Sequence, residues 1–301
     1  MIGLTGATGF VGNALYQELV RRNIKVRCFT RSKLATENDK NFFFLEYYNS
    51  NTNWTKALSG VDCIIHCAGI SGDLKGRKKD QLKLYNEINV EATDNLAIES
   101  LKLGVKRFIY LSSAKVNGEE SKNGKKFKIS DNVSPQTAYS MSKFNAEKKI
   151  KEISKNSNLE VVVIRSPAVY KNYGTGNIAK LANLIKKGFI LPFKSIKNKR
   201  SFISISNLID FIILCINSPN AANETFFVSD DNDISTVQLI EILAKNLNKP
   251  ARLIPFPPQL IKLFGYLTGT TGIINQLIGS LQVDITYTKK RMLWQPKNSL
   301  I

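Results

Sequence analysis

Apolar and polar positions follow one another in blocks through the first half of the chain, and each block predicts one element. Short runs that are apolar almost throughout predict buried strands, whereas apolar residues at helical spacing predict amphipathic helices. The predicted strands cover residues 1–5, 24–30, 41–48, 61–69, 105–113 and 159–167. The predicted helices of this half cover residues 9–22, 80–103 and 137–153.

This alternation predicts an α/β protein with a doubly wound parallel sheet, because parallel strands need helical crossovers between them. After Arg165 the rhythm loosens, and the prolines from Pro167 to Pro258 break the chain into shorter elements. We therefore expect a sheet domain over residues 1–165. A smaller, irregular lobe over residues 166–301, partly interleaved with the first, would bind substrate at the carboxyl edge of the sheet.

Composition describes an ordinary globular protein with an unusual charge. The 301 residues are 43% apolar and 22% charged, yet the formal net charge is +19. This balance suits anionic partners, although solvated lysine-rich loops explain it equally well. Few aromatic residues lie among the basic clusters, so we expect no nucleic-acid partner. The four cysteines form no CxxC pair, which favours reduced thiols and a cytoplasmic protein, and no cluster of ligands indicates a metal.

One uncharged stretch, residues 263–283, is long enough to cross a bilayer. It contains four glycines and several polar residues, which disfavour a membrane-spanning helix. We expect a partly buried helix and loop there, and no integral membrane span.

The segment TGATGFVG at residues 5–12 spaces three glycines, Gly6, Gly9 and Gly12, between the first strand and the first helix. Gly6 suits the tight turn, Gly9 allows a pyrophosphate to approach the backbone, and Gly12 allows close helix packing. The spacing and its context predict a dinucleotide-binding Rossmann domain over residues 1–165.

The end of the second strand bears on the choice of dinucleotide. No acid occurs from Lys25 to Thr36, where an Asp or Glu would hold the ribose of NAD. Arg31 and Ser32 lie instead where a 2′-phosphate would be bound. The sequence favours NADP, with NAD held by backbone contacts as the alternative.

Ser113 ends the fifth strand, and Tyr139 and Lys143 lie one turn apart on the next helix. A tyrosine needs a pKa shift of roughly 3 units, about 4 kcal/mol, to act as a base near neutrality. An ammonium about 4 Å away could supply on the order of 4 kcal/mol. Together with TGxxGxxG, VDCIIHCAG at 61–69 and VIRSPAVY at 163–170, these residues make the chain resemble the extended short-chain dehydrogenase/reductase superfamily, in its sugar-nucleotide epimerase/dehydratase branch.

The resemblance implies roles for particular residues. Ser113, Tyr139 and Lys143 would be catalytic. The cofactor would contact Gly6, Thr8, Gly9, Phe10, Val11, Gly12, Arg31, Ser32, Ala68, Asn89, Tyr139 and Lys143. The substrate would contact Lys115, Asn177 and Arg200. His66, the one histidine, is interpreted as structural. A homodimer through the helices near 80–103 and 136–155 is a further expectation from the resemblance.

Three functions remain open. GSLQVDI at 279–285 and SSAKVNGE at 112–119 resemble a subgroup of O-antigen and capsule pathways. That likeness favours NADPH-dependent 4-keto reduction of a UDP-4-keto-6-deoxy-N-acetylhexosamine, and Arg31 and Lys115 agree with it. The alternative is a UDP-hexose 4-epimerase, similar to UDP-glucose 4-epimerase, with tightly bound NAD. A non-catalytic dinucleotide-binding regulator is the third, disfavoured because Tyr139 and Lys143 are both present.

Overall fold

Seven strands form one twisted parallel sheet, which confirms the predicted α/β class. The computed structural model describes residues 1–71, 78–122, 124–171 and 176–297. The strand order is β3-β2-β1-β4-β5-β6-β9, and every neighbouring pair runs parallel. The strands are Ile2–Thr5 (β1), Val26–Thr30 (β2), Phe42–Phe44 (β3), Cys63–His66 (β4), Arg107–Ser113 (β5), Glu160–Ser166 (β6) and Thr225–Phe227 (β9).

Helices cover both faces of this sheet. Leucines of α1 (Phe10–Arg21) and α7 (Ile205–Asn217) belong to one core cluster with β1 and β4. Residues of α4 (Ala92–Lys102) and α5 (Ala138–Lys155) belong to a second cluster on the other face. Because each strand is covered on both faces, its sequence is apolar almost throughout rather than alternating.

The helix predicted over 80–103 is three segments. α3 (Lys78–Tyr85) runs into a π-helical segment, Asn86–Glu91, which continues as α4. π-helical turns are rare and are frequently found at functional sites. This one carries Asn89, which is buried.

The seventh strand, β9, comes from beyond residue 165 and pairs with β6. Helix α7 precedes β9 and packs on the same sheet, so the second half of the chain contributes to the first domain's core. β9 has only three residues, too few to stand out as a strand in the apolar pattern.

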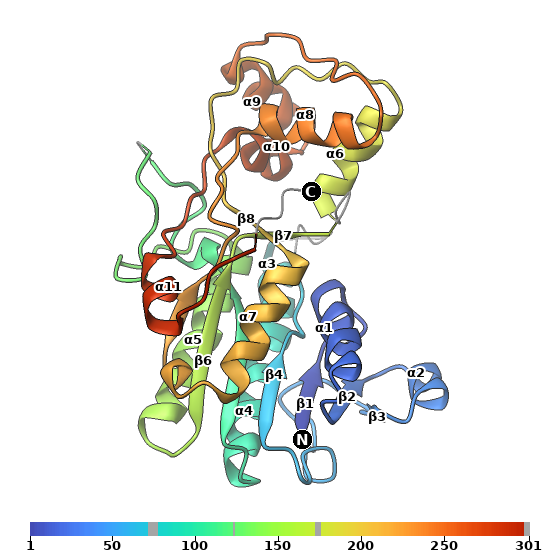
Figure 1. Ribbon diagram of the computed structural model, residues 1–301, viewed down its shortest axis with the longest axis vertical. Coiled ribbons are helices and arrows are strands. Elements are labelled where there is room, and N and C mark those ends of the chain that lie inside the picture. Colours follow the sequence, from blue (N-terminus) through green and yellow to red (C-terminus); the bar gives the residue numbers. More distant parts are fainter. Residues whose placement is uncertain (72–77, 123, 172–175, 298–301) are drawn as a thin grey trace.

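A smaller lobe has its own core, formed by Ile178, Leu181, Ile240 and Leu243 among others. Figure 1 shows this lobe beyond the carboxyl ends of the parallel strands. A short two-stranded sheet of β7 and β8 lies at the junction. The lobe and its junction with the sheet contain β7 (Ala168–Tyr170), α6 (Gly176–Lys186), β8 (Phe202–Ser204), α8 (Thr236–Asn246), α9 (Pro258–Leu267) and α10 (Thr271–Ile278), whereas α11 (Thr286–Met292) packs beside β9. Three short helices complete the chain: α2 (Lys33–Asn38) and the 3₁₀ turns Ala114–Val116 and Pro219–Ala221.

The uncharged stretch at 263–283 is divided between α9, which ends at Leu267, and α10, which begins at Thr271. Within the described residues, no helix is long and apolar enough to cross a membrane.

Candidate active site

The glycine turn lies between the end of β1 and the start of α1, as predicted. Gly6 has φ +72°, and a Cβ atom there would lie 2.7 Å from the backbone nitrogen of Ala68. A Cβ on Gly12 would lie 2.1 Å from the carbonyl oxygen of Gly6. No side chain caps the start of α1, so the backbone N–H groups of its first turn are available to an anion. The turn therefore fits a dinucleotide pyrophosphate, with Thr8 and Gly9 exposed and Phe10 and Val11 opening the helix.

Hydrogen bonds hold the neighbouring strand end against this turn. The Ala68 amide donates to Thr5 Oγ1 over 3.1 Å. The side chain of Asn89 accepts from the Ile70 amide (2.8 Å), and its own amide group donates to the Ile70 carbonyl and to Ser142 Oγ, each at 3.0 Å. Asn89 thereby ties the segment after β4 to α5, the helix that carries Tyr139 and Lys143.

His66 is a structural residue, in agreement with its interpretation from the sequence. Its Nδ1 lies 2.6 Å from Thr5 Oγ1 and its Nε2 lies 2.8 Å from Thr93 Oγ1. Burial, and to a lesser extent the charge of Lys143, lowers the pKa of His66 to about 3, so the imidazole is neutral.

Ser113 and Tyr139 meet at the carboxyl end of β5. Ser113 is the last residue of β5, and Tyr139 lies in the first turn of α5, which Thr137 begins with a capping box. The hydroxyl of Ser113 lies near enough to the phenol to act on it as a hydrogen-bond partner that lowers the pKa of Tyr139. The sequence-predicted serine and tyrosine are thus brought together at this end of the strand.

Lys143 lies one turn further along α5 and is 6% exposed. Its Nζ donates to the Leu111 carbonyl over 2.9 Å and lies 4.7 Å from the centre of the Tyr110 ring. A Cβ on Gly69 would lie 3.5 Å from this Nζ, so the ammonium borders the backbone after β4. Burial lowers the pKa of Lys143 to about 8, so it still carries a proton at pH 7.

The pKa of Tyr139 differs from the expectation. The sequence argument has Lys143 lower the pKa of Tyr139, whereas burial raises it to about 12, and the influence of Ser113 only partly offsets this. The physical reason is that the phenol is desolvated while the ammonium of Lys143 is bonded to the Leu111 carbonyl. The charges of the protein alone therefore do not make Tyr139 a base at neutral pH.

Arg31 and Ser32 are exposed directly after β2. Ser32 begins α2, accepting from the Ala35 amide at 3.3 Å. Arg31 lies close enough to Tyr48 for its charge to lower the pKa of that phenol, although burial raises it overall. An exposed guanidinium here could reach a cofactor phosphate or remain in solvent.

The three predicted substrate residues have different environments. Lys115 forms an ion pair with Glu119 (2.7 Å), so its charge is already compensated. Arg200 is half-buried and donates to the Gly279 carbonyl (2.8 Å), and burial lowers its pKa to about 10, against the charges of Glu119 and Glu120. Asn177 lies near the start of α6, but its side chain is outside the described part of the structure.

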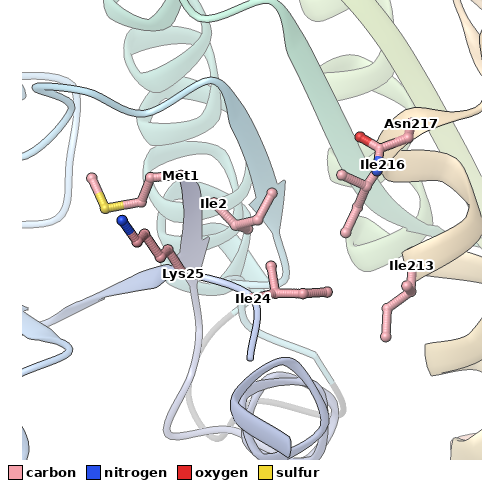
Figure 2. A pocket seen from close by; sticks show the side chains of 7 residues that line it. All are labelled: Met1, Ile2, Ile24, Lys25, Ile213, Ile216 and Asn217. Atoms are coloured by element: carbon pink, nitrogen blue, oxygen red, sulfur yellow. The ribbon is translucent and has the colours of Figure 1, made fainter. Parts of the chain in front are cut away.

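A separate hollow of about 210 Å³ lies at the other end of the sheet, where β1 and β2 begin. Figure 2 shows that Lys25 is the one charged side chain among those lining it. It contains none of the predicted site residues, which lie at or beyond the carboxyl edge of the sheet. The lining residues are Met1, Ile2, Ile24, Lys25, Ile213, Ile216 and Asn217.

The family is decided by a match over most of the chain. Residues 2–228 match the NAD dependent epimerase/dehydratase family. The chain belongs to that family. A relative from Vibrio cholerae, named UDP-glucose 4-epimerase, is 41% identical over 298 residues, covering 99% of this chain and 91% of its own. A more distant relative from Escherichia coli O157:H7 is 26% identical over 281 residues, covering 89% and 80% of the two chains, and is named N-acetyl-alpha-D-glucosaminyl-diphospho-ditrans,octacis-undecaprenol 4-epimerase.

Solved structures of similar proteins show the same extended short-chain dehydrogenase/reductase fold. UDP-glucuronic acid 4-epimerase from Bacillus cereus, in complex with NAD, superposes with a TM-score of 0.80 at 20% identity, covering 99% of this chain and 92% of that one. UDP-glucose 4-epimerase from Thermotoga maritima, with UDP-glucose, gives a TM-score of 0.75 at 19% identity, covering 99% and 94%.

Two groups of residues beside the candidate active site, Glu119 and the pair Glu147 and Arg165, were not predicted from the sequence. Glu119 pairs with Lys115 and also accepts from Thr137 Oγ1 (2.9 Å), so it joins the end of β5 to the start of α5. Glu147 and Arg165 form a buried ion pair behind Ser112. The only signal for the pair in the sequence was Glu147, one helical turn after Lys143. An acid at that position occurs just as often on a solvent-exposed helix face.

Proposed function

We propose that this protein is a UDP-hexose 4-epimerase that works with tightly bound NAD. The observation that carries the proposal is the proximity of Ser113 and Tyr139 at the carboxyl end of β5, with Lys143 one helical turn away and the glycine turn at the same sheet edge. The name of the Vibrio cholerae relative, which aligns with 99% of this chain, supports this reaction over the others.

Bound NAD supplies a hydride acceptor and, once reduced, a hydride donor for C4 of the sugar. Tyr139 would take the proton from the C4 hydroxyl as C4 is oxidised to a 4-keto sugar. When the sugar has turned its other face to the cofactor, Tyr139 would give that proton back to the C4 oxygen. Ser113 donates a hydrogen bond to that oxygen and keeps it beside the phenol.

The raised pKa of Tyr139 places a condition on this mechanism. To bring the pKa of Tyr139 from about 12 toward neutrality, its environment must lower that pKa by several units, and each unit corresponds to about 1.4 kcal/mol. Lys143 is protonated at pH 7, but the raised pKa of Tyr139 already includes that charge, so the further lowering would have to come from an oxidised nicotinamide ring. Proton abstraction is therefore expected only in the cofactor-bound enzyme.

The test is an assay of UDP-glucose and UDP-galactose interconversion without added cofactor, together with mass spectrometry of the purified protein for bound dinucleotide. We expect turnover and bound NAD. Tyr139→Phe should lower turnover by roughly 10²–10⁴-fold while cofactor binding persists. Tyr266→Phe, a matched change at a 75% exposed tyrosine, should change neither. Turnover that survives in Tyr139→Phe would contradict the mechanism.

A second candidate is NADPH-dependent reduction of a UDP-4-keto-6-deoxy-N-acetylhexosamine in surface polysaccharide synthesis. The observation favouring it is Arg31, exposed directly after β2 in a stretch, Lys25 to Thr36, that contains no acid. Lys115 no longer adds weight, because Glu119 compensates its charge. Oxidation of added NADPH by the 4-keto sugar, with no UDP-hexose interconversion, would establish this candidate in place of the first.

We also propose that Arg200 and Asn177 bind the substrate diphosphate, and that the protein is a homodimer. The guanidinium of Arg200 has further N–H donors besides the one that bonds to the Gly279 carbonyl, which suits phosphate recognition.

The homodimer would form through α4 and α5. These helices pack together and leave Ile98, Leu101 and Met141 exposed. Ile98→Glu together with Met141→Glu should give a monomer in sedimentation velocity; an unchanged mass would refute this interface.

A further inference from the structure

Helix α9 carries apolar side chains on two opposite faces. One face packs inward: Ile261 is 5% exposed, and Gly265 lies so close to α10 that a Cβ would approach Ile274 to 2.8 Å. The other face presents apolar residues to solvent at positions i, i+3, i+4 and i+7. Their exposed fractions are 48% for Leu260, 54% for Leu263, 66% for Phe264 and 72% for Leu267.

Further exposed apolar residues lie beside the start of this helix. Residues 252–254 hydrogen-bond to residues 191–194, and the chain then passes through Phe256 into α9. Phe189 (55%), Ile190 (59%), Ile254 (45%) and Phe256 (38%) are exposed along this path, and Tyr266 of α9 is 75% exposed. We call these residues, with the α9 stripe, the α9 surface. Figure 1 places α9 in the outer part of the lobe, away from the parallel sheet.

The two segments of the chain that carry the α9 surface are basic. Residues 178–199 and 249–282 include no Asp or Glu. They contain nine exposed cations, which make up nearly half of the net charge of +19. Lys187 precedes Phe189, Lys194 is paired with Ile254 through the backbone, and Lys262 lies on α9 itself. The nine are Lys180, Lys186, Lys187, Lys194, Lys197, Lys199, Lys249, Arg252 and Lys262.

We propose that the α9 surface docks on an anionic lipid bilayer, with the apolar stripe in the headgroup region and the lysines against lipid phosphates. An exposed apolar patch of this kind marks an interaction site. A second copy docked on the same surface would place the cations of these two segments against one another, which disfavours that pairing. A helix with apolar residues on its outer face and cations beside them is the pattern of an interfacial helix lying in the membrane plane.

The proposal concerns attachment to a surface, not crossing it. α9 has ten residues, and no described helix is long enough to span a bilayer. The surface does not depend on the reaction proposed above, since the residues used there belong to β5, α5 and the junction with the lobe. Loss of lipid binding and loss of catalysis are therefore separate observations.

The direct test is co-sedimentation of the full chain with vesicles of phosphatidylcholine alone and of phosphatidylcholine with 30% phosphatidylglycerol. We expect binding to the anionic vesicles at 0.1 M NaCl, weaker by about tenfold or more on neutral vesicles and at 0.5 M NaCl, because salt screens the attraction. Equal binding to both vesicle types, or to neither, would overturn the proposal.

Variants separate the stripe from the charges. Phe264→Glu with Leu267→Glu should reduce binding by about tenfold or more, whereas Val20→Glu with Leu34→Glu, at exposed positions of the sheet domain, should not. Replacing Lys187, Lys194 and Lys262 with Gln should weaken binding more than the same change at Lys40, Lys56 and Lys106, which are exposed elsewhere. If the stripe variant binds as the parent does, the stripe is not the docking surface.

A spectroscopic measurement reports the contact directly. Both native tryptophans, Trp54 and Trp294, are buried, so Tyr266→Trp adds the one exposed indole. Its emission should shift to the blue on anionic vesicles and be quenched by brominated lipid. No shift would overturn the proposal. So would sedimentation velocity that shows an oligomer dissolved by Phe264→Glu with Leu267→Glu, because a second copy would then be the occupant.

Discussion

Arg165 and Glu147 form a two-point ion pair in the interior: Nη2 lies 2.5 Å from Oε2, and Nε lies 3.0 Å from Oε1. Ser112 donates to the same carboxylate over 2.5 Å, and Arg165 also donates to Asn117 over 2.8 Å. The network joins β5, β6 and α5 directly behind Ser113 and Lys143. It therefore fixes how the helix with Tyr139 sits relative to the strand that ends in Ser113.

Breaking this pair should be costly. Glu147→Gln should lower the free energy of unfolding by about 3 kcal/mol in urea denaturation, because the Arg165 charge is left buried without its partner. Glu147→Leu with Arg165→Met should lose less than either single variant, since no charge is then buried. Glu99→Gln, which removes an exposed pair with Lys102, should change stability by less than about 1 kcal/mol. Additive losses in the double variant would argue against the coupling.

We expect the buried ammonium of Lys143 to be needed for turnover and to lower the free energy of unfolding of the cofactor-free protein. Its buried ammonium has a pKa lowered from 10.5 to about 8, so at pH 7 the folded protein pays for desolvating it. Lys143→Met should abolish turnover and yet stabilise the cofactor-free protein by about 2 kcal/mol at pH 7. The unfolded chain binds the extra proton between pH 8 and 10.5, so the parent regains stability there and the difference should shrink. A destabilised Met variant at pH 7 would mean that the bond to Leu111 outweighs desolvation.

The one histidine should give an acid-sensitive contribution to stability. His66 stays neutral in the folded protein down to about pH 3, whereas in the unfolded chain it takes up a proton below 6.5. Its contribution to folding should therefore be present near pH 7 and fall by about 2 kcal/mol as the pH drops to 5. Urea denaturation of the parent and of His66→Gln at both pH values measures this slope. Equal slopes for the two proteins would contradict it.

The glycine turn should not accept a side chain at Gly12. Gly12→Ala places a methyl group 2.1 Å from the Gly6 carbonyl, so the turn must move. We expect a loss of roughly 1–3 kcal/mol in stability and at least about a hundredfold weaker dinucleotide binding by calorimetry. Asn13→Ala, at the exposed neighbouring position of α1, is the control and should bind as the parent does.

Arg31 offers a test of cofactor choice. Arg31→Asp introduces an acid where a ribose hydroxyl would be held and removes the charge that would meet a 2′-phosphate. The ratio of NADPH to NADH affinity should fall by about tenfold or more if NADP is the natural cofactor. An unchanged ratio would remove Arg31 from the cofactor site and leave NAD as the better choice. Arg21→Asp, on the exposed side of α1, should not alter the ratio.

Patterns within short stretches of the sequence were sufficient to predict most of the fold. The glycine spacing of Gly6 and Gly12, the apolar strands and the Tyr139–Lys143 spacing are each set by neighbours in sequence, so they could be predicted. The π-helical segment around Asn89 and the three-residue β9 could not, because both depend on what packs against them. The division at residue 165 remains a prediction.

The amino-acid sequence by itself determined the parallel α/β sheet, the turn that accepts a dinucleotide and the identity of the serine, tyrosine and lysine. Periodicity and steric freedom are local properties, and the chain displays them directly. The tertiary structure decided the environment of the side chains. It raises the pKa of the Tyr139 phenol, bonds Lys143 to the Leu111 carbonyl and pairs Lys115 with Glu119. It also leaves an apolar face of α9 exposed to solvent. These depend on desolvation and on partners far away in the chain, which only the folded arrangement brings together.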